Sequence, residues 1–183
     1  MDNLEVAQFI YLLLYNEKIR QVIDTITSKV VLILGRFTEE RKKILDAIRE
    51  KLRECNYIPI LFDFKGPQSR DVIETIQLLA HMSRCVIADI TKPRTVPQEL
   101  RAFVGDLKVT TVLILEKGKD VEYGGAEHFK KYPWVSGPVE YENSEQLLNS
   151  LDKLINLAEK SKEESILAIE NVKEKFLKNL SQT

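Results

Sequence analysis

The chain has 183 residues, 44% of them hydrophobic, and its 27 basic and 28 acidic residues give a net charge of −1. This length and hydrophobic content fit one folded domain with appendages. The sequence has no basic cluster with interleaved aromatic residues, so we expect no nucleic-acid surface.

The sequence also argues against a membrane-spanning protein and against a metal-binding protein. The apolar run at residues 9–15 is far too short to span a bilayer, and the acidic N-terminus lacks the basic start of a signal peptide. The two cysteines, Cys55 and Cys85, have no metal-ligand spacing and are too few for a disulfide scaffold. We therefore expect a cytoplasmic protein without a metal site, in which both cysteines are core residues.

The first predicted element is a helix over residues 3–27. Its apolar residues form a stripe that covers well over half of the helix circumference. A stripe this wide indicates burial on more than one side. We expect this helix to pack on the domain and also on a partner.

Strands and helices then alternate along the chain. The predicted strands are 29–34, 57–64, 85–89, 109–115 and 139–141, and the helices between and after them are 38–55, 70–83, one that opens at 95–99, 126–132 and 144–160. Several strands are apolar throughout, which is typical of parallel sheets covered on both faces. Pro59 lacks an N–H group and places the second strand at the sheet edge.

This pattern predicts an α/β, flavodoxin-like three-layer sandwich with a five-stranded parallel sheet in the order 2-1-3-4-5. We expect the core domain to comprise residues 29–160. Residues 1–28 and a helix at 161–183 would be additions outside it, and each carries more apolar surface than one small sheet needs. Oligomerisation or docking on a partner protein is their expected role.

Residues 84–104 form the stretch with the clearest functional signal. A buried-type strand ends at Asp89, and a polar loop leads to a helix start at Thr95, with Glu99 in its first turn. The helix dipole favours a negative charge there, so we expect Glu99 to be ionised. Ligands of open parallel sheets bind at the carboxyl ends of the strands, which is where Asp89 lies. The alternative is that Glu99 has no catalytic role, because the helix dipole alone makes glutamate common in the first turn of a helix.

The residues from Met82-Ser83-Arg84-Cys85-Val86-Ile87 to Asp89, followed by Glu99-Leu100, resemble two related families. One is the nucleoside 2-deoxyribosyltransferases and the other is the TIR domains. In both, a helix after a central strand carries a catalytic glutamate. The wider stretch resembles an uncharacterised bacterial TIR-like group that shares the segment Tyr132-Pro133-Trp134, to which we assign no role.

The resemblance implies cleavage of a bond between an anomeric carbon and a nitrogen. It implies Glu99 as the nucleophile or electrostatic stabiliser and Asp89 as a residue that binds a ribose hydroxyl or orients Glu99. NAD is a possible substrate, no cofactor is required, and a role in bacterial defence follows by analogy. A plain alternative for Asp89 is a strand-end acid that caps the following loop.

Further candidates for substrate binding lie at the ends of the first two strands and on the helix predicted at 126–132. Arg36 could bind a phosphate, or remain a surface charge or pair with Asp63 or Asp89. Phe37 and Phe64 could stack on a base or pack in the core. His128 could reach a ligand or be structural. The complete set of substrate-binding candidates is Gly35, Arg36, Phe37, Asp63, Phe64 and His128.

Two functions from different classes follow. The first is an N-glycosidic-bond enzyme that acts on NAD or a nucleoside or nucleotide. The second is a non-catalytic TIR-like signalling or oligomerisation module. The second is favoured by departures from the family patterns: Thr95-Val96-Pro97 replaces the Trp-Cys that usually precedes the TIR glutamate, and Arg101 replaces the glycine that follows Glu-Leu in the transferases.

Overall fold

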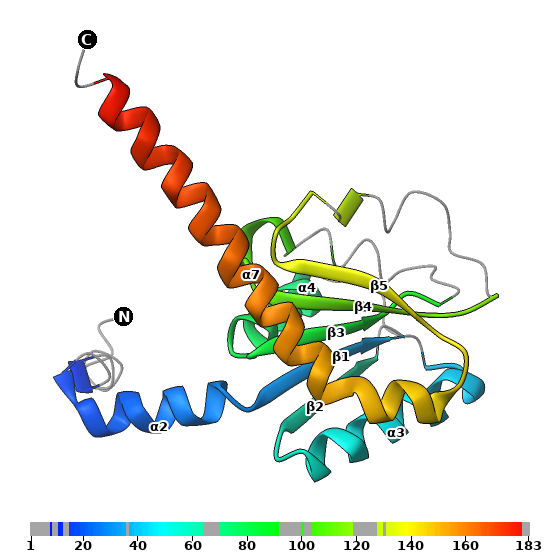
Figure 1. Ribbon diagram of the computed structural model, residues 1–183. Helices are drawn as coiled ribbons and strands as arrows, with labels where there is room; N and C mark the ends of the chain where they lie inside the picture. The colour runs from blue at the N-terminus through cyan, green and yellow to red at the C-terminus, as the bar shows by residue number, and fades with distance from the viewer. Residues whose placement is uncertain are drawn as a thin grey trace.

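The structure of the protein is a computed structural model that describes residues 8, 11–12, 15–35, 37–63, 70–91, 100, 104–118, 128–129 and 131–180. Within these residues, five parallel strands form one sheet in the order β2-β1-β3-β4-β5 (Figure 1). The strands are β1 (Val30–Gly35), β2 (Ile58–Asp63), β3 (Cys85–Asp89), β4 (Thr110–Glu116) and β5 (Val135–Tyr141). The predicted strand order and the flavodoxin-like α/β class are confirmed.

The central strands are buried on both faces. Every residue of β1 and β3 is buried, as expected for continuous apolar runs in a parallel sheet. β2 lies at the edge of the sheet, where Pro59 pairs in register with Val31 of β1. The missing N–H of this proline is tolerated because β2 is the outermost strand of the sheet formed by the described residues.

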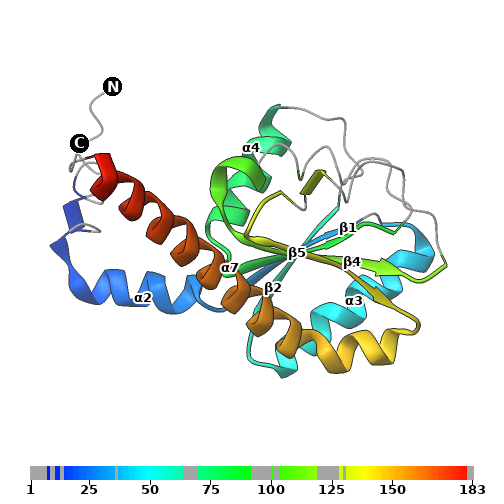
Figure 2. The ribbon, with the colours of Figure 1, turned by 45° about the horizontal axis from the view of Figure 1, so that its top comes forward.

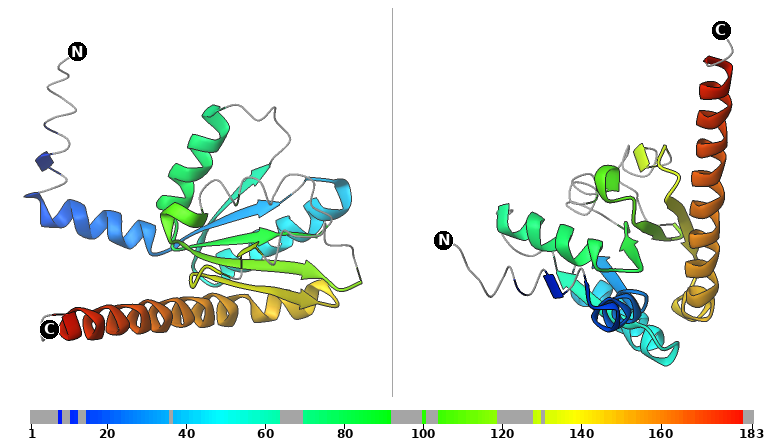
Figure 3. Two further views of the ribbon diagram at one scale, coloured as in Figure 1. Left: turned by 90° about the horizontal axis from the view of Figure 1, so that it is seen from above. Right: turned by 90° about the vertical axis from the view of Figure 1, so that its left-hand side faces the viewer.

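Helices cover both faces of the sheet (Figure 3). On one face lie α3 (Glu39–Glu54) and α7 (Ser144–Leu180), which contact each other and the sheet. On the other face lie α4 (Arg70–His81) and the segment around the buried Leu100 and Val104. The result is the three-layer arrangement that the alternation of strands and helices predicts.

Side-chain alternation along the strands divides the core in two. In β1, Val31 and Ile33 pack in a cluster with residues of α3 and α7, whereas Leu32 and Leu34 pack with α4. The same alternation directs Asp89, two residues after Ile87, toward the α3 and α7 side of the sheet, where its contacts lie. Helix α3 is capped by Thr38, whose hydroxyl accepts a hydrogen bond from the backbone N–H of Arg41.

The N-terminal region differs from the prediction of one helix over residues 3–27. Asn16 has an extended conformation and is the N-cap of α2 (Glu17–Thr27), with its side chain accepting hydrogen bonds from the N–H groups of Lys18 and Ile19. Asparagine is among the strongest N-cap residues, which explains the interruption. The expected packing on the domain is also wrong for α2, because none of its residues is buried.

Helix α7 runs without a break to Leu180 and includes both C-terminal helical segments expected from the sequence. Its first half packs on the sheet through buried residues such as Leu147, Leu151 and Ile155. Its second half continues past the sheet (Figure 1). No helix in the described part of the chain combines the length and apolar composition needed to cross a bilayer. The assignment of residues 29–160 as the core domain stays a prediction.

Candidate functional site

The candidate site lies at the carboxyl edge of the sheet. All five strands are parallel, so their last residues meet at this edge: Gly35, Asp63, Asp89, Glu116 and Tyr141. The chain passes from β1 outward to β2 and then back across β1 to β3, so the order reverses between β1 and β3. This switch point is where open α/β sheets bind ligands.

Asp89 is the acid at this switch point, and it is only 3% exposed. Its Oδ2 accepts a hydrogen bond from Nε of Arg41 at 2.8 Å and a second one from Nη2 of the same guanidinium. Its Oδ1 accepts a hydrogen bond from the backbone N–H of Thr91 at 3.0 Å. Both carboxylate oxygens therefore have protein donors, and the bond to Thr91 fits the interpretation of Asp89 as a cap for the following loop.

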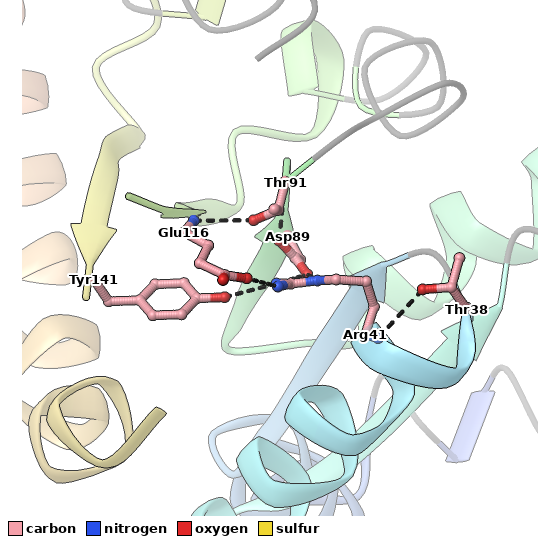
Figure 4. A network of polar contacts seen from close by, with 6 residues as sticks. All are labelled: Thr38, Arg41, Asp89, Thr91, Glu116 and Tyr141. Carbon is pink, nitrogen blue, oxygen red and sulfur yellow. Dashed lines mark hydrogen bonds and ion pairs between the residues drawn. The ribbon is translucent and has the colours of Figure 1, made fainter. Parts of the chain in front are cut away.

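Arg41 is the centre of the polar network (Figure 4). Besides Asp89, its Nη1 donates to Oε2 of Glu116 at 2.5 Å and its Nη2 donates to Oη of Tyr141 at 2.6 Å. Burial by itself would lower the pKa of Arg41, but Asp89 and Tyr141 more than offset this effect, so the pKa lies above its ordinary value. One fixed cation thus joins α3 to the ends of β3, β4 and β5.

The network also includes Thr91, the second residue after β3. The backbone N–H of Glu116 donates to Oγ1 of Thr91 at 3.0 Å, which ties Thr91 to the end of β4. Tyr141 is buried at the end of β5, and burial raises its pKa above the ordinary value although the bond from Arg41 acts in the opposite direction. We therefore expect Tyr141 to be a neutral phenol at physiological pH.

The substrate-binding candidates of the first loop separate into described and undescribed residues. Gly35 is buried at the end of β1, and a Cβ atom built on it would lie 2.8 Å from Cδ1 of Leu45. Phe37 is half-buried and packs against the core cluster on the α3 side, which agrees with the packing alternative. Arg36 lies outside the described residues.

The remaining candidates lie on other elements. Asp63 ends β2 and pairs in register with Gly35. His128 is half-buried, and its ring lies at 5.6 Å and 84° to the ring of Phe129 and at 6.2 Å and 69° to the ring of Tyr132. Phe64 and Glu99 lie outside the described residues. The structure thus brings Gly35, Asp63 and Asp89 to one edge of the sheet.

Four residues of the network were not predicted from the sequence: Arg41, Thr91, Glu116 and Tyr141. A signal for Arg41 was present, because it stands four residues before Leu45 and seven before Ile48, on the inner face of α3. A basic residue at an inner helical position indicates a buried ion pair. The strand-end positions of Glu116 and Tyr141 became informative only with the register of β4 and β5.

The segment Tyr132-Pro133-Trp134 has a structural role. Nε1 of Trp134 donates to the backbone carbonyl of Val104 at 2.6 Å, and the rings of Tyr132 and Trp134 lie 5.4 Å apart. Both aromatic residues pack against the core cluster on the α4 side. The segment therefore holds the start of β5 to the helical residues 104–107.

Among the described residues, no group of three or more histidine, cysteine, aspartate or glutamate side chains could hold a metal ion. Comparison of the chain with models of known protein families and with curated proteins gave no match. The resemblance to TIR domains and deoxyribosyltransferases accordingly stays a prediction based on the motif around Asp89 and Glu99.

Proposed function

We propose that the protein is an N-glycosidic-bond enzyme that acts on NAD or on a nucleoside or nucleotide. The observation that carries this proposal is the position of Asp89. It is a buried acid at the carboxyl end of β3, beside β1, at the point where the strand order reverses. Together with the motif that leads to Glu99, this position supports a ligand site at the carboxyl edge.

The described residues that flank residues 92–99, which include Glu99, are both buried. Thr91, which precedes residues 92–99, is 3% exposed and bonded to Asp89 and Glu116. Leu100, which follows them, is completely buried in the core cluster that also contains Ala88 and Ile90. A catalytic group must be held closely in place, so fixed ends are favourable for a role of Glu99.

In this proposal Asp89 orients Glu99 rather than binding a ribose hydroxyl. Both of its oxygens are already bonded to Arg41 and Thr91, so it is less suited to bind a ribose hydroxyl. Glu99 is the nucleophile or the stabiliser of the oxocarbenium-like transition state. The base leaves with the electron pair of the C–N bond, and water or a second acceptor forms the new bond at the anomeric carbon.

Arg36, Asp63, Phe64 and His128 remain proposed substrate contacts, whereas Phe37 packs against the core cluster on the α3 side. Of these, Arg36 suits a phosphate because its guanidinium fork matches phosphate oxygens. A cytoplasmic location is part of the proposal, since Cys55 and Cys85 are both free thiols.

The test incubates the protein with NAD and, separately, with a mixture of nucleosides and deoxynucleosides. Chromatography then measures the base that is released. We expect the wild-type protein to release a base and Glu99→Gln to lose at least roughly 100-fold in rate, because the amide cannot supply the negative charge. Glu54→Gln is the matched control, because Glu54 is an exposed glutamate at the C-terminal end of α3. Equal rates for wild type and Glu99→Gln would refute the role of Glu99.

A second function is supported by a different observation, the absence of buried residues in α2. It is a non-catalytic TIR-like signalling or assembly module that uses the terminal helices to bind another copy or a partner protein. This function predicts no base release under any condition, and a defined assembly that is lost when residues 1–28 or 161–183 are deleted. Base release by the protein, as a monomer or in an assembly, would exclude it.

A further inference from the structure

The end of β4 lies further out at the carboxyl edge than the end of β3. Asp89, the last residue of β3, pairs in register with Ile114 of β4. Glu116 follows Ile114 by two residues, so it lies about 7 Å further along the strand direction and on the same face of the sheet. This is the face on which Asp89 and Glu116 both contact Arg41.

Glu116 is the accessible member of the polar network around Arg41. The side chain of Glu116 is 24% exposed, whereas the side chains of Arg41 and Asp89 are 6% and 2% exposed. Thr91 and Tyr141 are buried as well. A molecule that arrives from solvent at this edge can therefore contact the carboxylate of Glu116, while the carboxylate of Asp89 is covered.

The carboxylate of Glu116 is also held in place. Its Oε2 accepts a hydrogen bond from Nη1 of Arg41 at 2.5 Å, and its backbone N–H donates to Oγ1 of Thr91 at 3.0 Å. Figure 4 shows the side chain of Glu116 reaching from the end of β4 to the guanidinium of Arg41. A carboxylate has about four lone-pair sites, so one that is bonded to an arginine can still accept a hydrogen bond from a hydroxyl. A fixed and accessible carboxylate of this kind is suited to orient a ligand.

The terminal helices lie away from Glu116. Helix α2 ends shortly before β1, so it adjoins the amino edge of the sheet, where the parallel strands begin. In α7, Glu159 forms an ion pair with Arg84, which directly precedes β3 at the same edge. The part of α7 after Glu159 extends past this end of the sheet (Figures 1 and 2). Neither α2 nor this part of α7 therefore covers the carboxyl edge.

The proposed reaction places a sugar at this edge, and its hydroxyl groups need acceptors. A hydrogen bond to the 2-hydroxyl, which is adjacent to the anomeric carbon, strengthens in the transition state of such reactions. We propose that Glu116 accepts a hydrogen bond from the 2′-hydroxyl of the ribose of the substrate, and that Arg41 positions Glu116 for this contact. This inference rests on the proposed function, and it assigns ribosyl compounds rather than 2-deoxyribosyl compounds as the substrate class.

The experiment compares base release from pairs of compounds that differ only in the 2′-hydroxyl. The pairs are each ribonucleoside with its 2′-deoxyribonucleoside, and NAD with the analogue that lacks the 2′-hydroxyl of the nicotinamide ribose. We expect Glu116→Ala to lower kcat/KM at least about 10-fold for the ribosyl member and less than about 3-fold for the deoxy member, because only the first loses a hydrogen bond to a charged group. Dividing the value for the variant by the value for the wild type removes the difference in intrinsic reactivity between the two sugars.

Glu142→Ala is the matched control. Glu142 directly follows β5 at the same edge of the sheet, but its ion pair with Lys117 is exposed. This variant should keep the wild-type kcat/KM for both members of each pair. Far-UV circular dichroism checks folding. If Glu116→Ala does not fold, the wild type decides, since its KM should be at least about 10-fold higher for the deoxy member of a pair.

The results that would overturn the proposal differ from those that would overturn the proposed function. Equal losses for both members of a pair in Glu116→Ala would show that Glu116 only supports the network, and base release from the deoxy members alone would exclude a contact with the 2′-hydroxyl. Either result would leave an N-glycosidic-bond enzyme in place. No base release by the wild type from any of these compounds would overturn the proposed function, and this proposal with it.

Discussion

Nε of Arg41 lies 2.8 Å from Oδ2 of Asp89, and the two side chains are only 6% and 2% exposed. The pair joins the first turn of α3 to the last residue of β3. Both nitrogens that bond Asp89 donate to the same oxygen, which leaves Oδ1 for the backbone of Thr91. The positions of Asp89 and Thr91, which precede Glu99 in the chain, therefore depend on the positive charge of Arg41 in α3.

We predict that Arg41→Ala lowers the free energy of unfolding by about 3–5 kcal/mol. Removing one partner of a buried pair leaves Asp89 as an uncompensated buried charge and also removes donors from Glu116 and Tyr141. Arg41→Lys should lower the free energy of unfolding by less, because lysine keeps the positive charge but lacks the planar fork of guanidinium donors. Urea unfolding measures both variants.

The control is Arg49→Ala on the same helix, whose partners Asp46 and Glu50 are solvent-accessible. This variant should cost far less, because exposed ion pairs contribute little. If Arg41→Ala and Arg49→Ala were equally stable, the guanidinium of Arg41 would not be the centre of a stabilising network.

The sheet could be predicted from the sequence because its strands carry the signal themselves. The apolar runs of β1 and β3 indicated strands buried on both faces, and Pro59 indicated the edge. The break at Asn16 was missed because the apolar stripe continues on both sides of it. A side-chain cap is a local hydrogen bond that hydrophobic periodicity does not register.

The candidate site was predictable only in part. Asp89 is recognisable as a strand-end acid, but its partner Arg41 is 48 residues away in the chain. Sequence spacing alone does not determine such a distant pair, since it requires the register of β1 and β3 and the packing of α3. The same reason applies to Glu116, which is placed beside Arg41 by the pairing of β3 with β4.

We predict that Gly35→Ala destabilises the protein by about 1–3 kcal/mol, because the new Cβ would lie 2.8 and 2.9 Å from the two methyl carbons of Leu45. Leu45 is completely buried and has little room to move. In the background of Leu45→Val, which shortens the opposing side chain, the same substitution should cost less. A double-mutant cycle with urea unfolding measures this coupling, and simple additivity would show that the contact is not the cause.

We predict an alkaline loss of stability that depends on Cys85. Burial raises the pKa of Cys85 from 9.0 to about 12. Below pH 9 the thiol is protonated in the folded and in the unfolded chain, so it adds no pH dependence to the free energy of unfolding. Between about pH 9 and 12 the unfolded chain loses this proton while the folded chain keeps it, so stability falls by up to about 1.4 kcal/mol for each pH unit.

The measurement compares urea unfolding of wild type and Cys85→Ala across this range, because other groups contribute equally to both proteins. The variant is less stable at neutral pH owing to its smaller side chain, but its stability should fall less steeply with pH. Cys55→Ala is the control, since Cys55 is partly exposed. Parallel curves for wild type and Cys85→Ala would contradict the prediction.

The last prediction concerns the attachment of α7 at the amino edge. Nε and Nη2 of Arg84 donate to the two carboxylate oxygens of Glu159 at 2.7 and 2.6 Å, and the guanidinium lies 5.5 Å from the ring centre of Tyr57. Both partners are partly exposed, so solvent screens the pair and we expect Glu159→Gln to cost only about 1 kcal/mol. Arg84→Ala should cost about 1–2 kcal/mol, because it also removes the contact with Tyr57.

Hydrogen exchange gives the more specific test. If this pair attaches α7 where it leaves the sheet, amide exchange around residues 156–162 should accelerate in both variants, while exchange in β1 and β3 should change little. Lys160→Ala is the control, because Lys160 and its partner Glu164 are both largely exposed and 3.8 Å apart. Faster exchange throughout the sheet would indicate instead that Arg84 stabilises the whole fold, whereas unchanged exchange in α7 would show that apolar packing of Leu151, Ile155 and Ala158 is sufficient to hold the helix.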